Sequence, residues 1–536
     1  MAEGSRSFNF PAPQKSALRP GEIVVDLFAG GGGASEALKQ ALGVDPALAY
    51  NHDEWAIGMH SANHPLTIHH REDIWHADPR IDVAGRAVGW FHASPDCTHF
   101  SQAKGGQPRS RKTRALSWVV LKWVGQLAGV GCAPRIVSLE NVWQILTWGP
   151  LVAKRDSATG RVLKMDGSVA APGERVPVEH QQLVPDKRRA GRTWRQFVAA
   201  LRAYGYAVEW QKLVASDFGA GTSRERLFLL ARRDGEPIRW PAPTNGKGPG
   251  LQRPVAAADC IDFSDLGRSI FDRPRPLADA TVRRIARGVV KHVLQASEPF
   301  FLTEFANAGN GGRTWSALEP LRTQCAGVKG GHFAVVAPVL AGVGGRAGQT
   351  EPRSGGVPIH TITAKADTAV ISAFLEQACG GYYTGAGTDL RNPAPTICAQ
   401  GSIQRLVSVE LSPDQQASAE RVAAFLINYY GNGTALGLRD PLDTVTTRDR
   451  MALVTVMVRG EPYVITDIKL RMLKPAELFR AQGFPADYVI DRTADGRPIS
   501  GTHAVRMVGN SVSPPPLRAL AEANLDRVPA HLAVAA

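Results

Sequence analysis

Three polar clusters along the chain carry side chains that could do covalent chemistry. Cys97 lies in "ASPDCTHFSQAKGG", just after an apolar run. Glu140 and Asn141 end a second apolar run, "PRIVSLEN", and Arg224 and Arg226 precede a third, "LFLLAR". A thiolate is a nucleophile, a carboxyl group can transfer a proton, and guanidinium groups form strong charge-assisted hydrogen bonds. Together these residue types suit nucleophilic catalysis, although Cys97 taken alone could equally be a small core residue behind a turn.

The stretch "EIVVDLFAGGGGASEALKQAL" predicts a strand, a glycine turn and a helix. Residues 23–27 form an apolar run of strand length, glycines occupy 30–33, and "ASEALKQAL" has helical composition and spacing. Such a turn lets a ligand approach bare backbone amides. The dinucleotide fingerprint G-x-G-x-x-G is incomplete, because Ser35 holds the third glycine position. Asp26 would repel a pyrophosphate and suits a ligand with an ammonium or sulfonium group, such as S-adenosylmethionine.

Further strands are predicted to end at the same edge of a sheet. "ALAYNHD" predicts a second strand, with Asn51 at its turn. "HHREDIW" places Asp73 near the next strand end, as an acceptor for an adenine amino group. "AVGWFHASPDC" predicts a fourth strand that leads directly to Cys97. Open α/β sheets bind their ligands at this edge.

Composition indicates a globular protein with a polyanionic partner. The chain has 536 residues, enough for two or three domains, with a net charge of +13. A pI near 9.6 favours nucleic acid as the partner. The six cysteines are scattered without zinc spacing. No apolar run has the length of a membrane span and the N-terminus lacks a signal peptide, so we expect a cytoplasmic protein.

Six segments, in this order, resemble the motifs of the DNA (cytosine-5)-methyltransferase family. They are "DLFAGGGG" (26–33), "SPDCTHFS" (94–101), "SLENVWQI" (138–145), "DFGAGTSRERLFLLARR" (217–233), "LRMLKPAELFRAQGFP" (470–485) and "GNSVSPPPLRAL" (509–520). The resemblance implies an α/β fold, with a Rossmann-like S-adenosylmethionine-dependent methyltransferase sheet and a smaller, β-rich target-recognition domain. It implies a DNA (cytosine-5-)-methyltransferase of the bacterial or phage modification type. Such an enzyme acts on double-stranded DNA as a monomer, requires no metal, and works at the bacterial nucleoid or in a phage-infected cell.

The resemblance also implies roles for particular residues. Cys97 would add to C6 of a flipped-out cytosine, Glu140 would contact ring N3 and the exocyclic amine, and Asn141 would orient the loop. Arg226 would hold the cytosine O2, and Arg224 would orient the cysteine or a phosphate. Expected cofactor contacts are Asp26, Phe28, Ala29, Gly30, Gly31, Gly32, Asn51, His52, Asp73, Ile74, Asn510 and Ser511. Expected DNA contacts are Ser101, Lys104, Arg109, Arg111, Lys112 and Arg114, in a segment that could instead be a solvated basic loop.

The chain departs from the family pattern at four positions. The family usually has proline directly before the cysteine, whereas here Asp96 takes that place and Pro95 lies one step earlier. Thr98 and Thr222 replace two glutamines, and Asn51 replaces the ribose-binding carboxylate. These differences bear on loop geometry, thiolate pKa and cofactor affinity. Because an adjacent carboxylate raises a thiol pKa, another group must favour the thiolate.

Four regions are expected along the chain. They are an N-terminal tail (1–20), a catalytic and cofactor-binding domain (21–245) with an insertion at about 150–192, a target-recognition region (246–465) and a return to the catalytic domain (466–536). The insertion could be an ordered β-hairpin near DNA. A repeat runs through the recognition region: "PLRTQCA" from Pro320, "PIHTITA" from Pro358, "PAPTICA" from Pro393 and "PLDTVTT" from Pro441. Lys365, Gln400 and Arg448 beside these repeats could face DNA, although repetition can equally be scaffold alone.

Other functions remain open at this point. A catalytically silent DNA-binding protein on the same scaffold, or an enzyme with an altered methyl donor, would share the motifs. Methylation of an exocyclic amine is disfavoured, since that chemistry usually places two prolines and an aromatic residue after an Asp, Asn or Ser, whereas here Pro95 is followed by Asp96 and Cys97. RNA is a possible substrate, and a NAD-dependent oxidoreductase is a distant alternative because the third glycine is missing.

Overall fold

The computed structural model of the chain describes most of its N-terminal half and its C-terminal end. The described residues are 16–96, 100, 114–277, 281–282, 285, 289, 301–304, 314–323, 333–342, 353–354, 373–378, 388–389, 403–408, 419, 421–422, 455–458 and 461–527. The chain divides into two compact units: unit 1 comprises 1–260, 320–327 and 474–536, and unit 2 comprises 261–319 and 328–473. Among the described helices, none combines the length and apolar character needed to cross a membrane.

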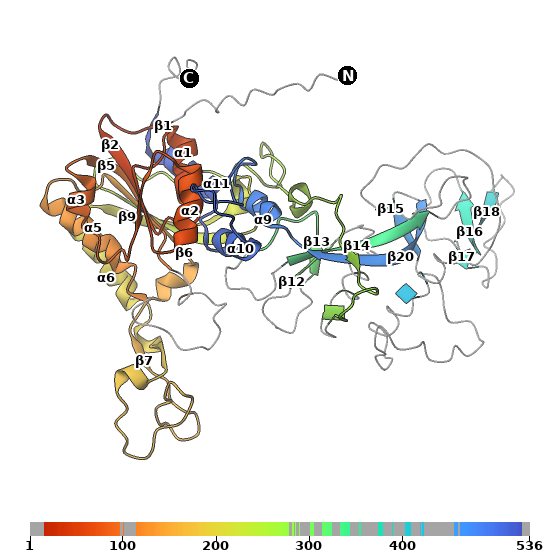
Figure 1. Ribbon diagram of the computed structural model, residues 1–536, viewed down its shortest axis with the longest axis horizontal. Helices are drawn as coiled ribbons and strands as arrows, with labels where there is room; N and C mark the ends of the chain where they lie inside the picture. The colour runs from red at the N-terminus through yellow and green to blue at the C-terminus, as the bar shows by residue number, and fades with distance from the viewer. Residues whose placement is uncertain are drawn as a thin grey trace. The chain divides into compact units, whose positions relative to one another are not determined.

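Unit 1 is built on a seven-stranded mixed sheet (Figure 1). In spatial order its strands are β4 (Ile68–Arg71), β3 (Leu48–Asn51), β2 (Glu22–Leu27), β5 (Ala87–Ala93), β6 (Ile136–Asn141), β10 (Glu225–Arg232) and β9 (Ala207–Val214). The first five run parallel, and β10 pairs antiparallel with both β6 and β9. After β2 the chain forms β3 and β4 on one side of β2 in the sheet, and then β5 on the other side of β2. The carboxyl ends of β2 and β5 therefore form the switch point at which doubly wound sheets bind ligands.

Helices cover both faces of this sheet. Their bounds are α1 (Gly33–Leu42), α2 (Glu54–Asn63), α3 (Pro79–Val83), α5 (Trp118–Gly129), α6 (Arg192–Ala203), α9 (Pro475–Gln482), α10 (Gly501–Asn510) and α11 (Pro514–Asn524). On one face α3, α5 and α6 pack on a core that includes Trp123 and Phe197. On the other face α1 and α11 pack on a core that includes Leu38 and Leu517. Strands β2, β3, β5 and β6 are mostly buried on both faces, which explains their nearly continuous apolar runs, whereas the edge strand β4 is partly exposed.

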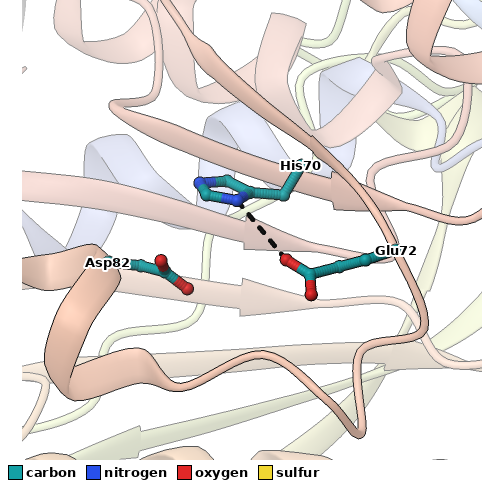
Figure 2. A group of neighbouring side chains, drawn as sticks. All are labelled: His70, Glu72 and Asp82. Carbon is teal, nitrogen blue, oxygen red and sulfur yellow. Dashed lines mark ion pairs between the residues drawn. The ribbon is translucent and has the colours of Figure 1, made fainter.

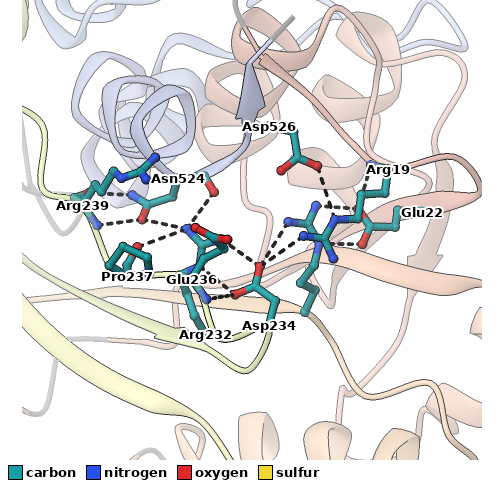
Figure 3. Close-up of polar contacts among 10 residues, drawn as sticks. Arg19, Glu22, Arg232, Asp234, Glu236, Pro237, Arg239, Asn524 and Asp526 are labelled. Atoms are coloured by element: carbon teal, nitrogen blue, oxygen red, sulfur yellow. Dashed lines mark hydrogen bonds and ion pairs between the residues drawn. The ribbon is translucent and has the colours of Figure 1, made fainter.

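A buried network of ion pairs joins the beginning of this sheet to the end of unit 1 (Figure 3). Asp234 accepts from Arg232 at 2.8 Å and lies 3.4 Å from Arg135. Arg135 also pairs with Glu22 at the start of β2, at 2.6 Å. Arg232 donates to the Asn524 carbonyl at the end of α11. These contacts hold the end of α11 near the start of β2. In the same region β1 (Ser16–Ala17) pairs with β21 (Asp526–Arg527).

Short elements complete unit 1. They are β7 (Leu151–Ala153), β8 (Leu183–Pro185) and the 3₁₀ turns η2 (Trp143–Thr147), η3 (Val178–His180), η4 (Lys187–Arg189), η5 (Ala215–Phe218) and η6 (Ala257–Cys260). Residues 320–323 also belong here, since Leu321 pairs in parallel with Thr222. Residues 320–323, the described start of the first copy of the sequence repeat, therefore lie beside the Arg-x-Arg segment. The other three copies, with Pro358, Pro393 and Pro441, lie outside the described residues, as do Lys365, Gln400 and Arg448.

Unit 2 is rich in β-structure where it is described. One sheet contains β11 (Arg268–Ser269), β12 (Phe301–Glu304), β13 (Thr314–Ser316), β14 (Phe333–Gly342), β15 (Arg353–Ser354), β19 (Thr455–Val458) and β20 (Glu461–Met472). A second contains β16 (Ala373–Ala378), β17 (Thr388–Asp389) and β18 (Ile403–Ser408). The predicted fold class, a Rossmann-like sheet with a β-rich second part, is confirmed. That unit 2 recognises the target, and that functional domains change at 245 and 465, stay predictions.

Candidate active site

The glycine turn after β2 uses left-handed backbone that few residues adopt. Phe28 has φ +63°, Gly30 +55° and Gly32 +97°. For a bulky residue such as Phe28 this conformation costs about 1–3 kcal/mol, and such strain collects where backbone must meet a ligand. A Cβ on Gly32 would lie 2.1 Å from the Tyr488 hydroxyl, and one on Gly33 would lie 2.1 Å from Ser511 Oγ. The glycines therefore allow the left-handed backbone of the turn and also its close packing against the C-terminal segment.

Asp26 is a fully buried carboxyl group beneath this turn. Its Oδ2 accepts a hydrogen bond from Ser35 Oγ at 2.7 Å, and Ser35 Oγ lies 2.8 Å from His60 Nε2. Its Oδ1 has no hydrogen-bond partner among the described residues. Burial raises the pKa of Asp26 from 3.8 to about 7, because a charged carboxylate is poorly solvated there. Near neutral pH the group is therefore poised between its neutral and charged forms.

Asp26 should make stability depend on pH. Its pKa is higher in the folded protein than in the unfolded chain, so stability falls as pH rises from about 4 to about 7. Burial lowers the pKa of His60, which contacts Ser35, well below 6.5. We expect Asp26→Asn to be more stable than the original protein at pH 8, by up to about 4 kcal/mol. The advantage should vanish near pH 4. Urea unfolding from pH 4 to 8 tests this, and a difference that does not change with pH would contradict it.

The residues expected to hold the nucleoside end of the cofactor lie at the ends of β3 and β4. The Asn51 side-chain oxygen accepts from the Asp53 amide at 2.9 Å, and Asp53 in turn caps α2. Arg506 of α10 forms an ion pair with Asp53. His52 is exposed on the same turn. The strand ends are therefore tied to the C-terminal segment through Asp53, which the sequence had not singled out as a site residue.

The other expected cofactor residues surround the same edge. Asp73 is exposed and its carboxylate accepts from the Trp75 amide at 3.1 Å, whereas Ile74 is buried. Asn510 is exposed at the last position of α10. Ser511 is buried and donates to the Val512 carbonyl at 2.9 Å. Ala29, between Phe28 and Gly30, donates its amide to the Tyr50 carbonyl at 3.0 Å, which joins the glycine turn to the end of β3.

This edge fits the amino-acid end of S-adenosylmethionine. Helix α1 has Gly32 as its N-cap without a side-chain cap hydrogen bond, and the N-terminal end of a helix favours a negatively charged group such as a carboxylate. The unpartnered Oδ1 of Asp26 calls for a donor such as an ammonium group. A Cβ on Gly30 would have the Phe28 carbonyl oxygen as its nearest neighbour, at 3.9 Å, so that flank of the turn is open.

Glu140, near the end of β6, lies close to Arg224, which directly precedes β10, and to Arg226 within that strand. Its Oε1 is 3.1 Å from Arg226 Nε and 3.7 Å from Arg224 Nη2. Glu140 is 6% exposed and Arg224 3%. Both guanidinium groups are at ion-pair distance, but no N–H is aimed at Oε1, which has no hydrogen bond within the described residues. A buried carboxylate oxygen of this kind can accept from an amino group of a ligand.

Two contacts connect Glu140 and its neighbours to other motifs. Asn141 Nδ2 donates to the Pro95 carbonyl at 2.9 Å, and its Oδ1 accepts from the Val142 amide. Arg224 Nη1 donates to the Gly509 carbonyl at 3.1 Å. The segments around 95, 140, 224 and 509, far apart in sequence, therefore meet. Cys97 itself lies outside the described residues, two positions after Pro95.

A buried histidine joins the two strands that lead to these motifs. His92 of β5 has Nδ1 2.8 Å from Ser138 Oγ on β6 and Nε2 2.8 Å from Ser94 Oγ. Ser138 Oγ also accepts from Trp90 Nε1 at 2.9 Å. Burial lowers the pKa of His92 to about 3, so its ring is neutral and can donate from one nitrogen while accepting at the other. This ring links the β5–Pro95 segment to the strand of Glu140.

The two hydroxyl groups that contact His92 should have different roles, one affecting the rate of methyl transfer and the other the stability of the fold. Ser94→Ala frees the end of β5 and should lower the single-turnover rate about tenfold while changing unfolding free energy by less than about 1 kcal/mol. Ser138→Ala leaves the buried Trp90 Nε1–H without its acceptor and His92 Nδ1 without its partner, and should cost about 1–3 kcal/mol of stability. Rapid-quench rates and urea unfolding distinguish the two. Identical profiles for both variants would show that the histidine is simply a core residue.

Most of the expected DNA contacts lie outside the described residues. These are Ser101, Lys104, Arg109, Arg111 and Lys112.

Arg114, which follows that segment, is only 5% exposed. Its guanidinium lies 4.5 Å from the centre of the Phe100 ring, and Nη2 donates to the Gly149 carbonyl at 3.3 Å. With Trp118 and Trp148 it lines a cavity of about 250 Å³. Contact of Arg114 with a phosphate would require this packing to open.

One group of side chains could hold a metal ion (Figure 2). His70, Glu72 and Asp82 each offer an atom within 4.8 Å of the others, and His70 Nδ1 is 3.4 Å from a Glu72 oxygen. All three are partly exposed. Asp82 also accepts from the Tyr50 hydroxyl at 2.8 Å, and the Tyr50 ring stacks on His70. These contacts give each of the three side chains a partner within the protein.

Comparison with known proteins assigns the chain to a family. A family model for C-5 cytosine-specific DNA methylase matches residues 23–149, 182–284 and 410–525, more than half of the chain. The chain belongs to this family. The matched segments include Asp26, Glu140, Arg226 and Ser511, so the residues that the fold brings together lie within the family's shared part. Residues 150–181 lie outside it.

Individual relatives are distant. The Type II methyltransferase M.AgeI of Thalassovita gelatinovora is 26% identical over 267 residues, which are 48% of this chain and 49% of that protein. The chain thus spans about half the length of this curated relative. A prophage-encoded E. coli protein, solved as a DNA modification methyltransferase, aligns over 94% of this chain and 98% of its own, with 16% identity and a TM-score of 0.39. The Dnmt2 methyltransferase of S. pombe aligns over 93% and 97%, with 11% identity and a TM-score of 0.42.

Several contacts at this edge were not foreseen from the sequence. His92 could have been noticed, since it is a polar residue inside the apolar run "AVGWFHA". The Asp53–Arg506 pair and the Tyr488 hydroxyl, which donates to the Gly31 carbonyl at 2.7 Å, had no such signal. Each joins residues more than 400 positions apart, and no local pattern records such a pairing.

Proposed function

We propose that this protein transfers a methyl group from S-adenosylmethionine to C5 of a cytosine flipped out of duplex DNA, through a covalent adduct with Cys97. Family membership supports the reaction class. The observation that carries the proposal is the buried Glu140, whose Oε1 lies beside Arg226 and Arg224 without an aligned hydrogen bond. Asn141, the next residue, bonds the carbonyl of Pro95, and this brings the chain next to Cys97 to the same place.

The chemistry follows from the low reactivity of the cytosine ring. C5 is a poor nucleophile until a thiolate adds to C6, which breaks the 5,6 double bond and places an electron pair on C5. Bound S-adenosylmethionine supplies an electrophilic methyl group. After C5 has gained this group, water or hydroxide removes the C5 proton. The electron pair then restores the double bond and expels the thiolate of Cys97, so the enzyme is regenerated.

Glu140 and Arg226 would recognise the base. The open Oε1 of Glu140 suits the exocyclic amine, while a proton shared between the carboxyl group and ring N3 would stabilise the adduct. Arg226 would donate to the cytosine O2, and its Nε, 3.1 Å from Glu140 Oε1, supports a role for both residues at the same base. Arg224 would act indirectly, since it is buried and donates to the Gly509 carbonyl.

The cofactor would lie along the carboxyl ends of β2, β3 and β4. Asp26, Phe28, Ala29 and the glycines 30–32 would meet its amino-acid end, with Ser511 and Asn510 opposite. Asn51 and His52 would contact the ribose, and Asp73 and Ile74 the adenine. Asn51 offers only its amide hydrogens, because its oxygen is held by Asp53, so we expect a ribose contact weaker than a carboxylate would make.

We infer that DNA is the polyanionic partner that the positive net charge of the chain favours. Flipping a cytosine costs a few kcal/mol of stacking and pairing, and contacts to phosphates offset part of that cost. The net charge of +13 supports such contacts. Unit 2, with its β-rich structure, would recognise the target sequence.

A labelled-methyl assay tests the proposal. The full chain is incubated with S-adenosylmethionine labelled in its methyl group and with mixed-sequence duplex DNA, and the nucleosides are then separated by mass. We expect 5-methylcytosine, and bisulfite sequencing of a host that expresses the chain should give its target site. Label on an exocyclic amine, label in RNA alone, or tight DNA binding without transfer would each overturn the proposal.

A further inference from the structure

A folded arm, residues 150–189, extends the catalytic unit beyond the family's shared part. The family model stops at residue 149 and resumes at 182. Strands β7 and β8 pair at the base of the arm, and isolated bridges join Arg155 to Val162 and Lys164 to Gln181 farther along it. Figure 1 shows the arm, which carries the label β7, standing away from the sheet and from helices α5 and α6.

The arm has internal structure of its own. The Met165 amide donates to the His180 carbonyl and the Gln182 amide to the Leu163 carbonyl, both at 2.9 Å. Ala170 and Val176 are buried within it. In a turn-rich segment without such contacts, nothing would offset the conformational entropy that is lost when the chain adopts one conformation. These bonds and buried side chains make the arm an element that can present side chains in fixed positions.

The base of the arm is fixed to the edge of the sheet that carries the active site. Turn η2 follows β6, so only seven residues separate Asn141 from Gly149. The Trp148 carbonyl accepts from the amides of Thr193 and Trp194, at 3.0 and 3.1 Å. A Cβ on Gly149 would lie 2.4 Å from the Arg189 carbonyl, so the two ends of the arm meet closely. Whatever the arm binds is therefore held beside the substrate edge.

The arm and the first residue of α6 carry an excess of positive charge. Residues 150–192 contain nine Lys and Arg against five Asp and Glu, a net charge of +4. Four of the acidic groups are used inside the arm: Asp156 bonds Thr159, Asp166 bonds Ser168, Glu174 pairs with Lys164, and Asp186 pairs with Arg189. The charge of residues 150–192 that is available to a binding partner is therefore positive.

Lys187, Arg188 and Arg192, here called the basic group, concentrate this unpaired charge. They lie on η4 and at the start of α6, within six residues of one another. All three are exposed, and within the described part of the chain none forms an ion pair within 4.0 Å of an acidic group, although Asp186 lies close enough to Arg188 to feel its charge. Guanidinium and ammonium groups on a rigid element at a substrate edge are suited to phosphate oxygens.

We propose that the arm binds the phosphodiester backbone of the DNA substrate beside the target cytosine, with the basic group as its main contact. This rests on the proposed function, since it assigns a further surface to the same substrate. Contacts to phosphates carry no sequence information, so the arm adds affinity and orientation without changing the target sequence.

Salt dependence of binding tests the arm directly. We compare the full chain with the K187A/R188A/R192A variant on a 30-base-pair duplex over a range of salt concentrations. Each lost phosphate contact lowers the slope of log affinity against log salt by about 1, so the variant should lose about 3. KM for DNA should rise at least about tenfold, while kcat at saturating DNA and the methylated sequence stay unchanged.

A control variant with the same charge change separates a site from a general effect of charge. R202A/R233A/R527A removes three exposed, positively charged side chains. They lie near the amino end of β6 and the β1–β21 pair, at the edge of the sheet opposite to the site. It should change the slope by less than about 1. Equal slopes for the two variants would overturn the inference, as would loss of affinity for RNA or anionic vesicles but not for duplex DNA. Failure of the unchanged protein to methylate DNA would instead refute the proposed function, whatever the slopes show.

Discussion

Replacement of Cys97 by serine is expected to reduce the single-turnover rate of methyl transfer to duplex DNA by at least about 10³-fold. Serine is nearly the same size, but its hydroxyl group is not ionised near neutral pH, so addition to C6 is lost. The unfolding free energy and the affinity for DNA should remain close to those of the unchanged protein. Rapid-quench measurement with labelled methyl donor and excess enzyme gives this rate without a contribution from product release.

A second cysteine provides the matched control for this substitution. Cys132 is a free cysteine, partly exposed, before the start of β6. It lies at the end of the sheet opposite to the site, so Cys132→Ser should leave the rate unchanged. If the Cys97 variant kept more than about a tenth of the rate, the reaction would proceed without a covalent adduct.

Replacement of Glu140 by glutamine is expected to lower the same rate by about 10²–10⁴-fold. The change keeps the shape of the side chain but removes the charge that faces Arg226 and Arg224, together with the ability to share a proton with ring N3. Some stability should also be lost, because two buried guanidinium groups lose their counter-ion. The rate is measured at saturating DNA and cofactor, so weaker binding cannot imitate the effect.

Glu22→Gln is the matched control for loss of a buried carboxylate. Glu22 pairs with Arg135 at 2.6 Å at the opposite end of the same sheet, and both side chains are buried. This variant should lower the melting temperature comparably while leaving the single-turnover rate within about twofold of normal. If both variants slowed methyl transfer equally, the effect of Glu140 would be one of stability and not of chemistry.

The order of secondary structure in unit 1 could be predicted from local patterns. The run 23–27 followed by glycines gave a strand and a helix, and the structure has β2 and α1 there. "PRIVSLEN" and "RERLFLLAR" are β6 and β10. These segments are buried on both faces, so their apolar content is a strong signal. The fold class followed from their order.

Contacts between distant segments could not be predicted in this way. Thr222, a departure from the family pattern, has a hydroxyl group that donates to the Arg322 carbonyl at 3.3 Å. Residues 320–323 thereby join unit 1, although the sequence placed them inside the recognition region. Arg224 likewise bonds Gly509, 285 positions away. Such pairings depend on the assembled sheet, and neither periodicity nor spacing contains them.

Two other departures remain open for experiment. Asn51 uses its oxygen in the turn before α2, which leaves its amide hydrogens for the cofactor. Asp96 directly precedes Cys97, and because an adjacent carboxylate raises a thiol pKa, another group must favour the thiolate. Both positions can be changed to the residue usual in the family, and cofactor affinity and the pH dependence of the rate measured for each.

Covalent trapping tests the central claim most directly. A duplex with 5-fluorocytosine at the target site blocks the last step, because fluorine at C5 cannot leave as a proton does. With S-adenosylmethionine present, we expect a complex of one protein and one duplex that survives denaturation, and mass spectrometry should place the link at Cys97. Normal methylation of an unmodified duplex, without any trapped complex on the fluorinated one, would contradict it.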